Sequence, residues 1–317
     1  MKSTRAHIST FTLPQVVQAR ARLYAKIREY FSARKVLEVE TPIINRCTVT
    51  DPHIDSIGIT CGGQRQFLHT SPEYAMKRLL VSLRCDAYQL CKVFRAGESG
   101  RFHHTEFTML EWYRMGWSYR DLMQEVDDLV RQALDGGPAL HESEFIRYQE
   151  AFLQYCALDP WSAGLEDYRS ACRQAGIVPS VQWSCDACQA LLLDQVIAAH
   201  LPKDRMTFVY DFPAQHSGLA RINNQGRAER FEVYVGSLEL ANGYQELTDA
   251  DKQCKRFDAD NEKRRQEGKE VLESDESLIR ALKKGLPECA GVALGIDRLL
   301  MLITDVDDIR EVLACPD

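Results

Sequence analysis

The chain has 317 residues, of which 45% are hydrophobic and 27% are charged, and its formal net charge is −7. This length and composition are ordinary for a globular protein with one large domain or two small ones, and the acidic balance argues against broad binding of polyanions. No apolar run reaches the length of a membrane span, and the first residues lack the apolar core of a signal peptide. Eleven cysteines without such a signal are typical of reduced thiols. We therefore expect a cytoplasmic protein that does not enter a membrane.

The first part of the chain is predicted to contain two helices with two short strands between them. The predicted elements are a helix over 12–33, strands over 36–43 and 67–70, and a helix over 71–83. Thr12 and Pro14 are typical of a helix N-cap and first turn. Ser71 has the position of a second N-cap, with Glu73 in the first turn that follows.

The remaining elements fall into groups of helices and runs of strands. In chain order they are a strand-like run over 107–113, a helix over 118–134 broken at 136–138, a mostly helical segment over 141–200, strands over 205–212 and 229–236, a polar helix over 248–268, a strand over 291–295 and a helix over 296–303. The segment 141–200 carries no recognisable chemistry and is a possible helical insertion. Runs of strands with helices grouped between them favour an α+β fold with an antiparallel sheet.

The most informative segment runs from Arg95 through a Gly-containing loop into a strand. In that strand Phe107, Met109, Glu111 and Tyr113 alternate with other residues, so all four fall on one face. An arginine suits a phosphate, an aromatic ring suits a base, and a carboxylate beside a phenol suits an ammonium group. Their arrangement along one strand predicts a site that activates an amino acid with ATP.

Four ordered blocks resemble the class II aminoacyl-tRNA synthetases, in the version that handles lysine. They are Val36–Pro42 (motif 1), Phe94–Tyr113 (motif 2), Arg230–Leu247, and Gly291–Arg298 (motif 3). The resemblance extends from about Val16 to about Val312. It implies the class II synthetase core, an antiparallel sheet flanked by helices in a single catalytic domain over 1–317. It also implies a homodimer built around motif 1.

The resemblance assigns ATP to the motif 2 and motif 3 residues. Arg95 matches the arginine at the α-phosphate, Arg298 the arginine at the γ-phosphate, and Phe107 the ring that stacks on adenine. Both arginines are implied to be catalytic, because a cation stabilises the charge of the transition state. The further implied ATP contacts are Ala96, Gly97, Glu98, His103, His104, Glu239, Leu240 and Gly295. Glu232 and Glu239 match the carboxylates that hold Mg²⁺, an ion that prefers oxygen ligands.

The resemblance also assigns a pocket for the amino acid. Buried ammonium groups need paired acceptors, and several carboxylates meet that need. The implied contacts are Ser71, Pro72, Glu73, Glu111, Tyr113, Asn242, Glu246 and Ala293.

The motif 2 loop departs from the family in two places. The family has Arg-Xaa-Glu where this chain has glycine at position 97 and its acid one residue later, at Glu98. His104-Thr105 replaces the usual Asn-Pro. We therefore expect the loop to contact ATP differently.

Three short stretches bring the resemblance closer to truncated paralogues, the elongation factor P–lysine ligases. These are Ser71–Tyr74, Glu111–Arg114 and Gly291–Gly295, and the first predicted helix begins too early for an anticodon-binding domain before it. Lysyl enzymes usually have alanine at position 71 and glycine at position 293. The resemblance implies a pocket reshaped for (R)-β-lysine rather than lysine.

The implied activity is ATP-dependent ligation of (R)-β-lysine to a lysine ε-amine of elongation factor P, with no tRNA. Two alternatives stay open at this point. One is a minimal lysyl-tRNA synthetase-like enzyme, or one that forms diadenosine polyphosphates. The other is a non-catalytic module that senses ATP or an amino acid, against which the set Arg95, Glu232, Glu239 and Arg298 argues.

Overall fold

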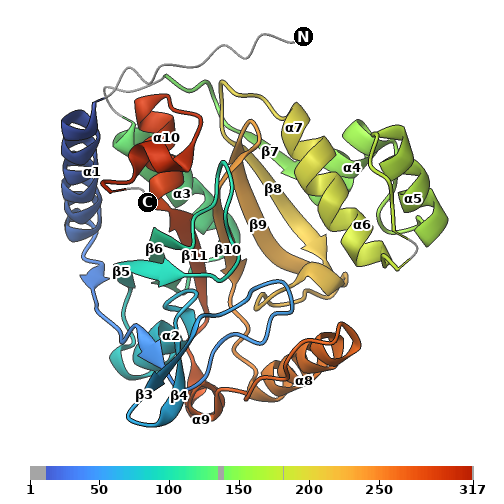
Figure 1. Ribbon diagram of the computed structural model, residues 1–317. Helices are drawn as coiled ribbons and strands as arrows, with labels where there is room; N and C mark the ends of the chain where they lie inside the picture. The colour runs from blue at the N-terminus through green and yellow to red at the C-terminus, as the bar shows by residue number, and fades with distance from the viewer. Residues whose placement is uncertain (1–11, 135–138, 181, 316–317) are drawn as a thin grey trace.

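The computed structural model describes residues 12–134, 139–180 and 182–315, so the predicted break at 136–138 lies outside the described residues. Within the described residues, one sheet of eight strands forms the centre of the molecule (Figure 1). Its strands, in spatial order, are β1 (Leu37–Glu38), β5 (Ala87–Phe94), β6 (Glu106–Met115), β11 (Cys289–Gly295), β10 (Leu238–Gln245), β9 (Arg227–Val235), β8 (Thr207–Pro213) and β7 (Glu144–Arg147). Neighbours are antiparallel except at the two edges, where β1 pairs with β5 and β7 with β8 in parallel. The expected α+β fold with a largely antiparallel sheet is confirmed.

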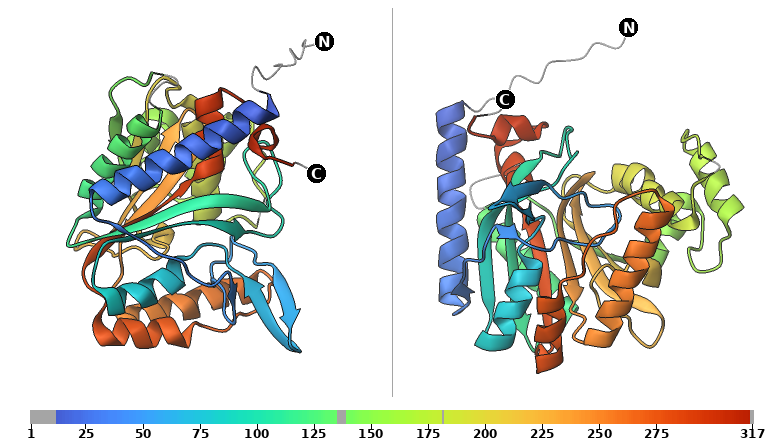
Figure 2. Two further views of the ribbon diagram at one scale, coloured as in Figure 1. Left: turned by 90° about the vertical axis from the view of Figure 1, so that its left-hand side faces the viewer. Right: turned by 60° about the horizontal axis from the view of Figure 1, so that its bottom comes forward.

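Strand alternation gives the large sheet two different faces. Leu110 and Trp112 of β6 and Val292 and Leu294 of β11 point into the main hydrophobic core. That core is covered by α1 (Leu13–Ala33), α3 (Tyr119–Ala133) and α10 (Ile296–Thr304), and α1 lies across this side of the molecule in Figure 2. The intervening residues of both strands, such as Glu111 and Ala293, therefore face the opposite side, where a cavity lies.

A second cluster of helices closes one end of the opposite face. It consists of α2 (Glu73–Leu83), α8 (Ala250–Gln266) and α9 (Glu276–Gly285), and a small sheet of β2 (Ile44–Asn45), β4 (Gln64–Leu68) and β3 (Gly58–Cys61) lies beside it in Figure 1. Met76 and Leu80 of α2 pack with Phe257 of α8 and with Leu278 and Leu282 of α9. This packing holds α2 over the end of β6.

The segment predicted as a helical insertion has both helices and one strand. The helices are α4 (Tyr148–Cys156), α5 (Leu165–Gln174), α6 (Cys185–Leu192) and α7 (Ala198–His200), with a π-helical turn η1 (Leu193–Ile197) between the last two. They form their own hydrophobic cluster, which includes Phe152, Tyr168 and Leu192. Strand β7 instead extends the main sheet beside β8. The division of the chain into one domain with an insertion stays a prediction.

Two local expectations about element ends are wrong. Strand β1 contains only Leu37 and Glu38, and the chain leaves the sheet before Pro42, which has no N–H to donate to a ladder. Ser71 is not a helix cap, because α2 begins two residues later, at Glu73, and Pro72 is its N-cap residue. By contrast Ser118 caps α3 as expected, accepting a hydrogen bond from the backbone N–H of Asp121.

Two short 3-10 turns complete the described chain path, η2 (Ala214–His216) and η3 (Ile309–Val312). None of the helices in the described part of the chain is both long and apolar enough to span a bilayer.

Candidate active site

Three neighbouring strands form the floor of the cavity. Their register places Glu111 of β6, Ala293 of β11 and Asn242 of β10 in one row across the sheet. Tyr113, Gly291 and Tyr244 form the next row. On this face the central strand contributes only the small residues Gly291, Ala293 and Gly295 to the cavity lining, so the floor is a trough between two strands with large side chains.

Gly291 is required by close packing across this trough. A Cβ atom at this position would lie 2.4 Å from Oε1 of Glu246 and 2.4 Å from a ring carbon of Tyr113. Any larger residue would push these two side chains apart. The glycine of motif 3 therefore allows a carboxylate and a phenol to approach each other over the central strand.

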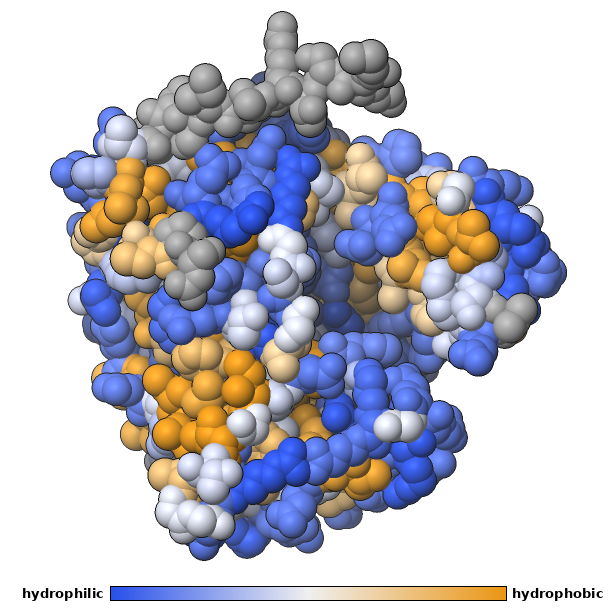
Figure 3. Space-filling model, in the orientation of Figure 1, coloured by the Kyte–Doolittle hydropathy of each residue, from blue (hydrophilic) through white to orange (hydrophobic). Residues whose placement is uncertain are grey.

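The cavity above this floor has a volume of about 670 Å³ and opens in the hollow between two lobes (Figure 3). Most of the residues predicted for the site line it together. They are Ser71, Glu73, Arg95, Glu98, His103, His104, Phe107, Glu111, Tyr113, Glu239, Leu240, Asn242, Glu246, Ala293, Gly295 and Arg298. Pro72, Ala96, Gly97 and Glu232 do not line the cavity. The structure thus joins the predicted ATP and amino-acid contacts in one space, while their roles stay predictions.

One wall of the cavity is a buried acidic pocket. Glu73, Glu111 and Glu246 line it, and the Tyr113 hydroxyl donates to Oε1 of Glu111 at 2.6 Å. Behind this wall Nζ of Lys77 lies 2.6 Å from Oε1 of Glu73 and 2.5 Å from Oε2 of Glu246. The pocket therefore combines three carboxylates with a single lysine ammonium.

Burial dominates the electrostatics of this wall. It raises the pKa of Glu111 well above the usual range, with a further contribution from the charge of Glu73. Burial also raises the pKa of Glu246 to about 7, although the Lys77 ammonium opposes the shift. Burial alone would lower the pKa of Lys77, but Glu246 and Glu73 raise it overall, so Lys77 stays charged. Carboxylates in such surroundings favour a ligand that brings positive charge.

Arg298 connects several parts of the site on the side of the cavity that is predicted to hold the phosphates. Its Nη1 donates to the backbone oxygen of Glu239 at 2.8 Å and lies 3.3 Å from Oε2 of that residue. Nη2 donates to Nε2 of His103 at 2.9 Å, and Nε donates to the Phe102 carbonyl. Burial and the neighbouring Arg298 charge lower the pKa of His103, so a neutral imidazole accepts this bond. The helix α10 thereby meets both β10 and the motif 2 loop.

Arg95 occupies the other side of the predicted nucleotide space. Its guanidinium carbon lies 5.2 Å from the centre of the Phe107 ring, and Nη1 lies 3.5 Å from Oε1 of Glu98. Glu98 thus turns back to Arg95 even though it comes one residue later than in the family. Gly97 has a φ of +74°, the conformation that makes this tighter loop possible. His104 contacts the backbone oxygen of Glu106 at 2.8 Å through Nδ1.

The two predicted magnesium ligands have different surroundings. The Glu239 carboxylate lines the cavity and its side chain is 38% exposed. Glu232 is buried and accepts hydrogen bonds from Arg230 and from the Tyr234 hydroxyl. Glu239 therefore fits a hard cation among phosphate oxygens, whereas Glu232 as it stands lies outside the cavity.

Sequence reasoning missed three residues beside the site. Lys77 stands four residues after Glu73, and this i,i+4 spacing of opposite charges was a visible signal. Arg230 lies two residues before Glu232 on the same strand face, and this pairing of opposite charges was a second visible signal. His216 left no signal, because it comes from the turn η2 and meets the site only in three dimensions.

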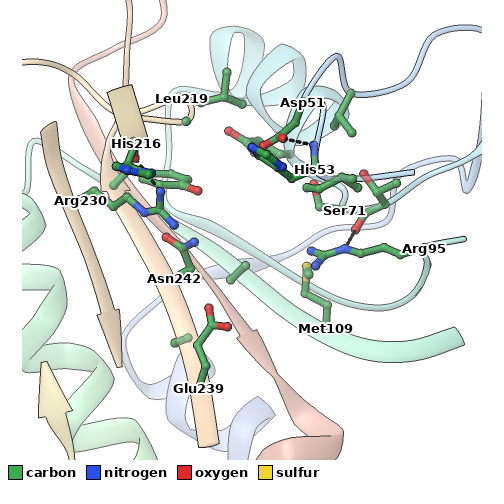
Figure 4. A pocket seen from close by; sticks show the side chains of 18 of the residues that line it. Asp51, His53, Ser71, Arg95, Met109, His216, Leu219, Arg230, Glu239 and Asn242 are labelled. Atoms are coloured by element: carbon green, nitrogen blue, oxygen red, sulfur yellow. Dashed lines mark hydrogen bonds between the residues drawn. The ribbon is translucent and has the colours of Figure 1, made fainter. Parts of the chain in front are cut away.

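Figure 4 shows how these side chains surround the cavity. Arg230 and His216 lie together beyond Asn242, while Arg95 and Met109 lie across from them. The Nη1 group of Arg230 donates to the His216 carbonyl at 2.6 Å. The His216 ring in turn contacts Oε1 of Gln189 in α6 at 2.7 Å. This wall thus connects the sheet with the helices of 141–200.

A largely antiparallel sheet with two arginines and an acidic pocket on one face is the arrangement typical of class II synthetase cores. Comparison with known proteins agrees: the model of the family "tRNA synthetases class II (D, K and N)" matches residues 5–317. The chain belongs to this family.

Two curated relatives are similar over nearly the whole chain. Both are named elongation factor P–(R)-β-lysine ligase, one from Photorhabdus laumondii and one from Pectobacterium carotovorum. Each is 44% identical over 305 residues, which are 93% of this chain and 93% of the relative. The resemblance to these ligases is confirmed, and the chain is an ATP-dependent amino-acid ligase.

Proposed function

We propose that this chain adenylates (R)-β-lysine with ATP and transfers the β-lysyl group to the ε-amine of a lysine on elongation factor P. The observation that carries the proposal is one cavity that joins a pocket of three buried carboxylates to a space lined by Arg95 and Arg298. The substrate and acceptor are those in the names of the two relatives.

In the first step the substrate carboxylate attacks the α-phosphorus of ATP. The bond to the bridging oxygen breaks, pyrophosphate leaves, and an acyl-adenylate forms. Arg95 stabilises the negative charge at the α-phosphate, and Arg298, backed by His103, holds the departing phosphates. The Phe107 ring, beside the Arg95 guanidinium, provides a face for adenine.

In the second step the neutral ε-amine of the acceptor lysine attacks the acyl carbon. An amide forms, AMP leaves, and the attacking nitrogen loses a proton. We assign Glu73, Glu111 and Glu246 to the ammonium groups of β-lysine, with Asn242 and Ala293 beneath its chain. Buried carboxylates with raised pKa values bind such groups because the added positive charge offsets the cost of their burial.

Mg²⁺ belongs to the proposal as a partner of ATP. Glu239 is the carboxylate that would hold it, since its oxygens line the cavity beside Arg298. Bound there, the ion would neutralise charge on the phosphates.

Amino-acid-dependent exchange of pyrophosphate into ATP tests the first step. We expect exchange with (R)-β-lysine and much weaker exchange with lysine. Addition of elongation factor P should then give one β-lysyl mass increment, and an acceptor whose target lysine is replaced by arginine should give none. Exchange with lysine alone, together with acylation of tRNA, would favour the minimal lysyl-tRNA synthetase instead.

A further inference from the structure

Lys77 lies behind the acidic wall and has no place in the predicted chemistry. Its side chain is only 2% exposed and does not line the cavity, whereas its partners Glu73 and Glu246 do. Its ammonium bridges carboxylates of two separate elements, α2 and the end of β10, at 2.6 and 2.5 Å. Lys77 therefore cannot touch a substrate, but it controls the charge that the wall presents.

The charge of the pocket follows from a short count. Glu73, Glu111 and Glu246 contribute −3 when ionised and Lys77 contributes +1, which leaves −2. The other titratable groups that face these carboxylates are Tyr74, Cys91, Tyr113, Tyr244 and Cys289. Burial raises the pKa of each, so all of them are neutral near pH 7. When all three carboxylates are ionised, the pocket thus carries two that lack a compensating positive charge.

An amino acid with two ammonium groups cancels this charge. An amino acid with one ammonium group leaves a buried carboxylate without a partner, which is unfavourable or forces it to take up a proton. Without Lys77 the wall would carry three charges, and even a diammonium substrate would leave one carboxylate unpaired.

We infer that Lys77 is the positioning residue that matches this pocket to a diammonium amino acid, by neutralising one of three buried carboxylates from behind. The inference rests on the proposed function only in that the cavity receives an amino acid. It does not depend on whether the second amine stands at the α or the β carbon.

A proton balance follows from this arrangement. Before the substrate binds, burial favours the protonated forms of Glu111 and Glu246, since it raises the pKa of both, that of Glu246 to about 7. A diammonium ligand displaces these protons. Binding at pH 7 should therefore release on the order of one proton, and KM should rise about tenfold for each pH unit below 7.

Replacing Lys77 with an uncharged residue should make Glu111 and Glu246 hold their protons up to a higher pH. Lys77 lowers the pKa of both Glu111 and Glu246, so its removal raises both values further. In Lys77→Met the pH below which KM rises should move upward by about 1–3 units, the usual effect of an adjacent opposite charge. Lys77→Arg should restore most of the original profile. A mere packing defect would instead reduce activity evenly at every pH.

The experiment measures KM between pH 6 and 9 by pyrophosphate exchange for wild type and both variants. The ligands are 3,6-diaminohexanoate (β-lysine), lysine, and 6-aminohexanoate, which is β-lysine without its 3-amino group. We expect at least a hundredfold weaker use of 6-aminohexanoate by wild type. Lys92→Met is the matched control, since Lys92 pairs with Glu106 at the surface, and it should leave the pH profile unchanged.

Calorimetry on the wild type keeps the inference testable if Lys77→Met does not fold. Binding of the preferred diaminohexanoate is measured in two buffers of different ionisation enthalpy, which counts the protons released. Release of no proton, or an unmoved KM profile in a folded Lys77→Met protein, overturns the inference. A preference for lysine over β-lysine contradicts the proposed substrate but leaves the proton test in force, because both ligands carry two ammonium groups.

Discussion

Arg298 shows how a single side chain connects several elements on the side of the cavity where we propose that the phosphates bind. Its guanidinium contacts Glu239 of β10, His103 of the motif 2 loop and the Phe102 carbonyl. Five fixed donors on a planar group suit this position better than the single ammonium of a lysine. In the proposed function, the same planar group would bind phosphate oxygens of ATP.

We predict that Arg298→Ala and Glu239→Ala each remove most pyrophosphate exchange. Loss of one group that stabilises charge in the transition state costs on the order of 3–4 kcal/mol, which is roughly a 10²–10³-fold loss of rate. Circular dichroism should show an unchanged fold, because both side chains line a cavity rather than the core. Unchanged exchange rates in the folded variants would refute the site assignment.

At the residue scale, we propose that Ala293 determines which substrate shape the pocket accepts. It lies on the central strand of the trough, between Glu111 and Asn242, so its methyl group is part of the floor. A mismatch of one methylene in a pocket is worth roughly 1–3 kcal/mol. Ala293→Gly should therefore raise activation of lysine relative to β-lysine.

The measurement is the ratio of kcat/KM for the two amino acids. Ser71→Ala should move this ratio in the same direction but less, since it removes a hydroxyl at the cavity wall rather than volume beneath the substrate. An unchanged ratio in Ala293→Gly, starting from a wild type that uses both isomers equally, would contradict the β-lysine proposal.

At the scale of elements, a chain of hydrogen bonds couples the helices of 141–200 to the sheet. Gln189 of α6 donates to the Tyr168 hydroxyl at 2.6 Å and contacts the His216 ring at 2.7 Å. The His216 carbonyl accepts from Arg230, which also pairs with Glu232. A shift of α6 would thus be transmitted through His216 to Arg230 and Glu232 of the sheet.

His216, which lies in the middle of this chain of hydrogen bonds, should make the free energy of unfolding depend on pH. Burial, with help from the Arg230 charge, lowers the pKa of His216 from its usual 6.5 to about 4. Between these values the unfolded chain binds a proton that the folded protein does not. The free energy of unfolding should therefore be highest above pH 6.5 and fall by up to about 3 kcal/mol as the pH drops to 4.

Denaturant unfolding of His216→Gln tests the effect, because glutamine does not titrate and can still donate to Gln189. The fall in stability between pH 6.5 and 4 should shrink by about that amount. His141→Gln, at a site that is 73% exposed, is the matched control and should keep the wild-type slope. A His216→Gln protein that loses stability in acid as steeply as wild type would show that other groups cause the loss.

At the scale of the whole molecule, the edge of the large sheet bears on assembly. Strand β1 is an edge strand, and the segment that continues from it exposes Leu37, Ile43 and Ile44 by 40% or more. An edge with exposed apolar side chains is a common place for a second chain to bind. This agrees with the homodimer expected from motif 1, which stays a prediction.

We predict a dimer at micromolar concentration that Ile44→Asp dissociates, because a buried unpaired carboxylate at an interface is costly. Sedimentation velocity measures the change. Val178→Asp is the control, since Val178 is apolar and 87% exposed but lies between α5 and α6 rather than near β1. A wild type that sediments as a monomer yet is fully active would rule out a functional dimer.

Much of the fold and site followed from local patterns. The alternation in 107–113 correctly placed Phe107, Glu111 and Tyr113 on one face, since side chains of a strand alternate regardless of what surrounds them. The Ser118 cap was predictable for the same reason, because it involves only residues one turn apart. The family motifs added the expectation that Arg95, Glu239 and Arg298 meet in one site, and all three line the same cavity.

Tertiary structure decided what depends on partners far apart in the chain. Ser71 has the side chain of a helix cap, yet it lines the cavity wall while α2 begins after Pro72. Glu232 matches a metal ligand by position, but Arg230 and Tyr234 take up both of its oxygens. Lys77 can take its inferred role only because the fold brings Glu246, which follows β10 and is distant in the chain, to its ammonium. The amino-acid sequence by itself determined which residues share a face, whereas burial and charge pairing depend on long-range packing and came only from the tertiary structure.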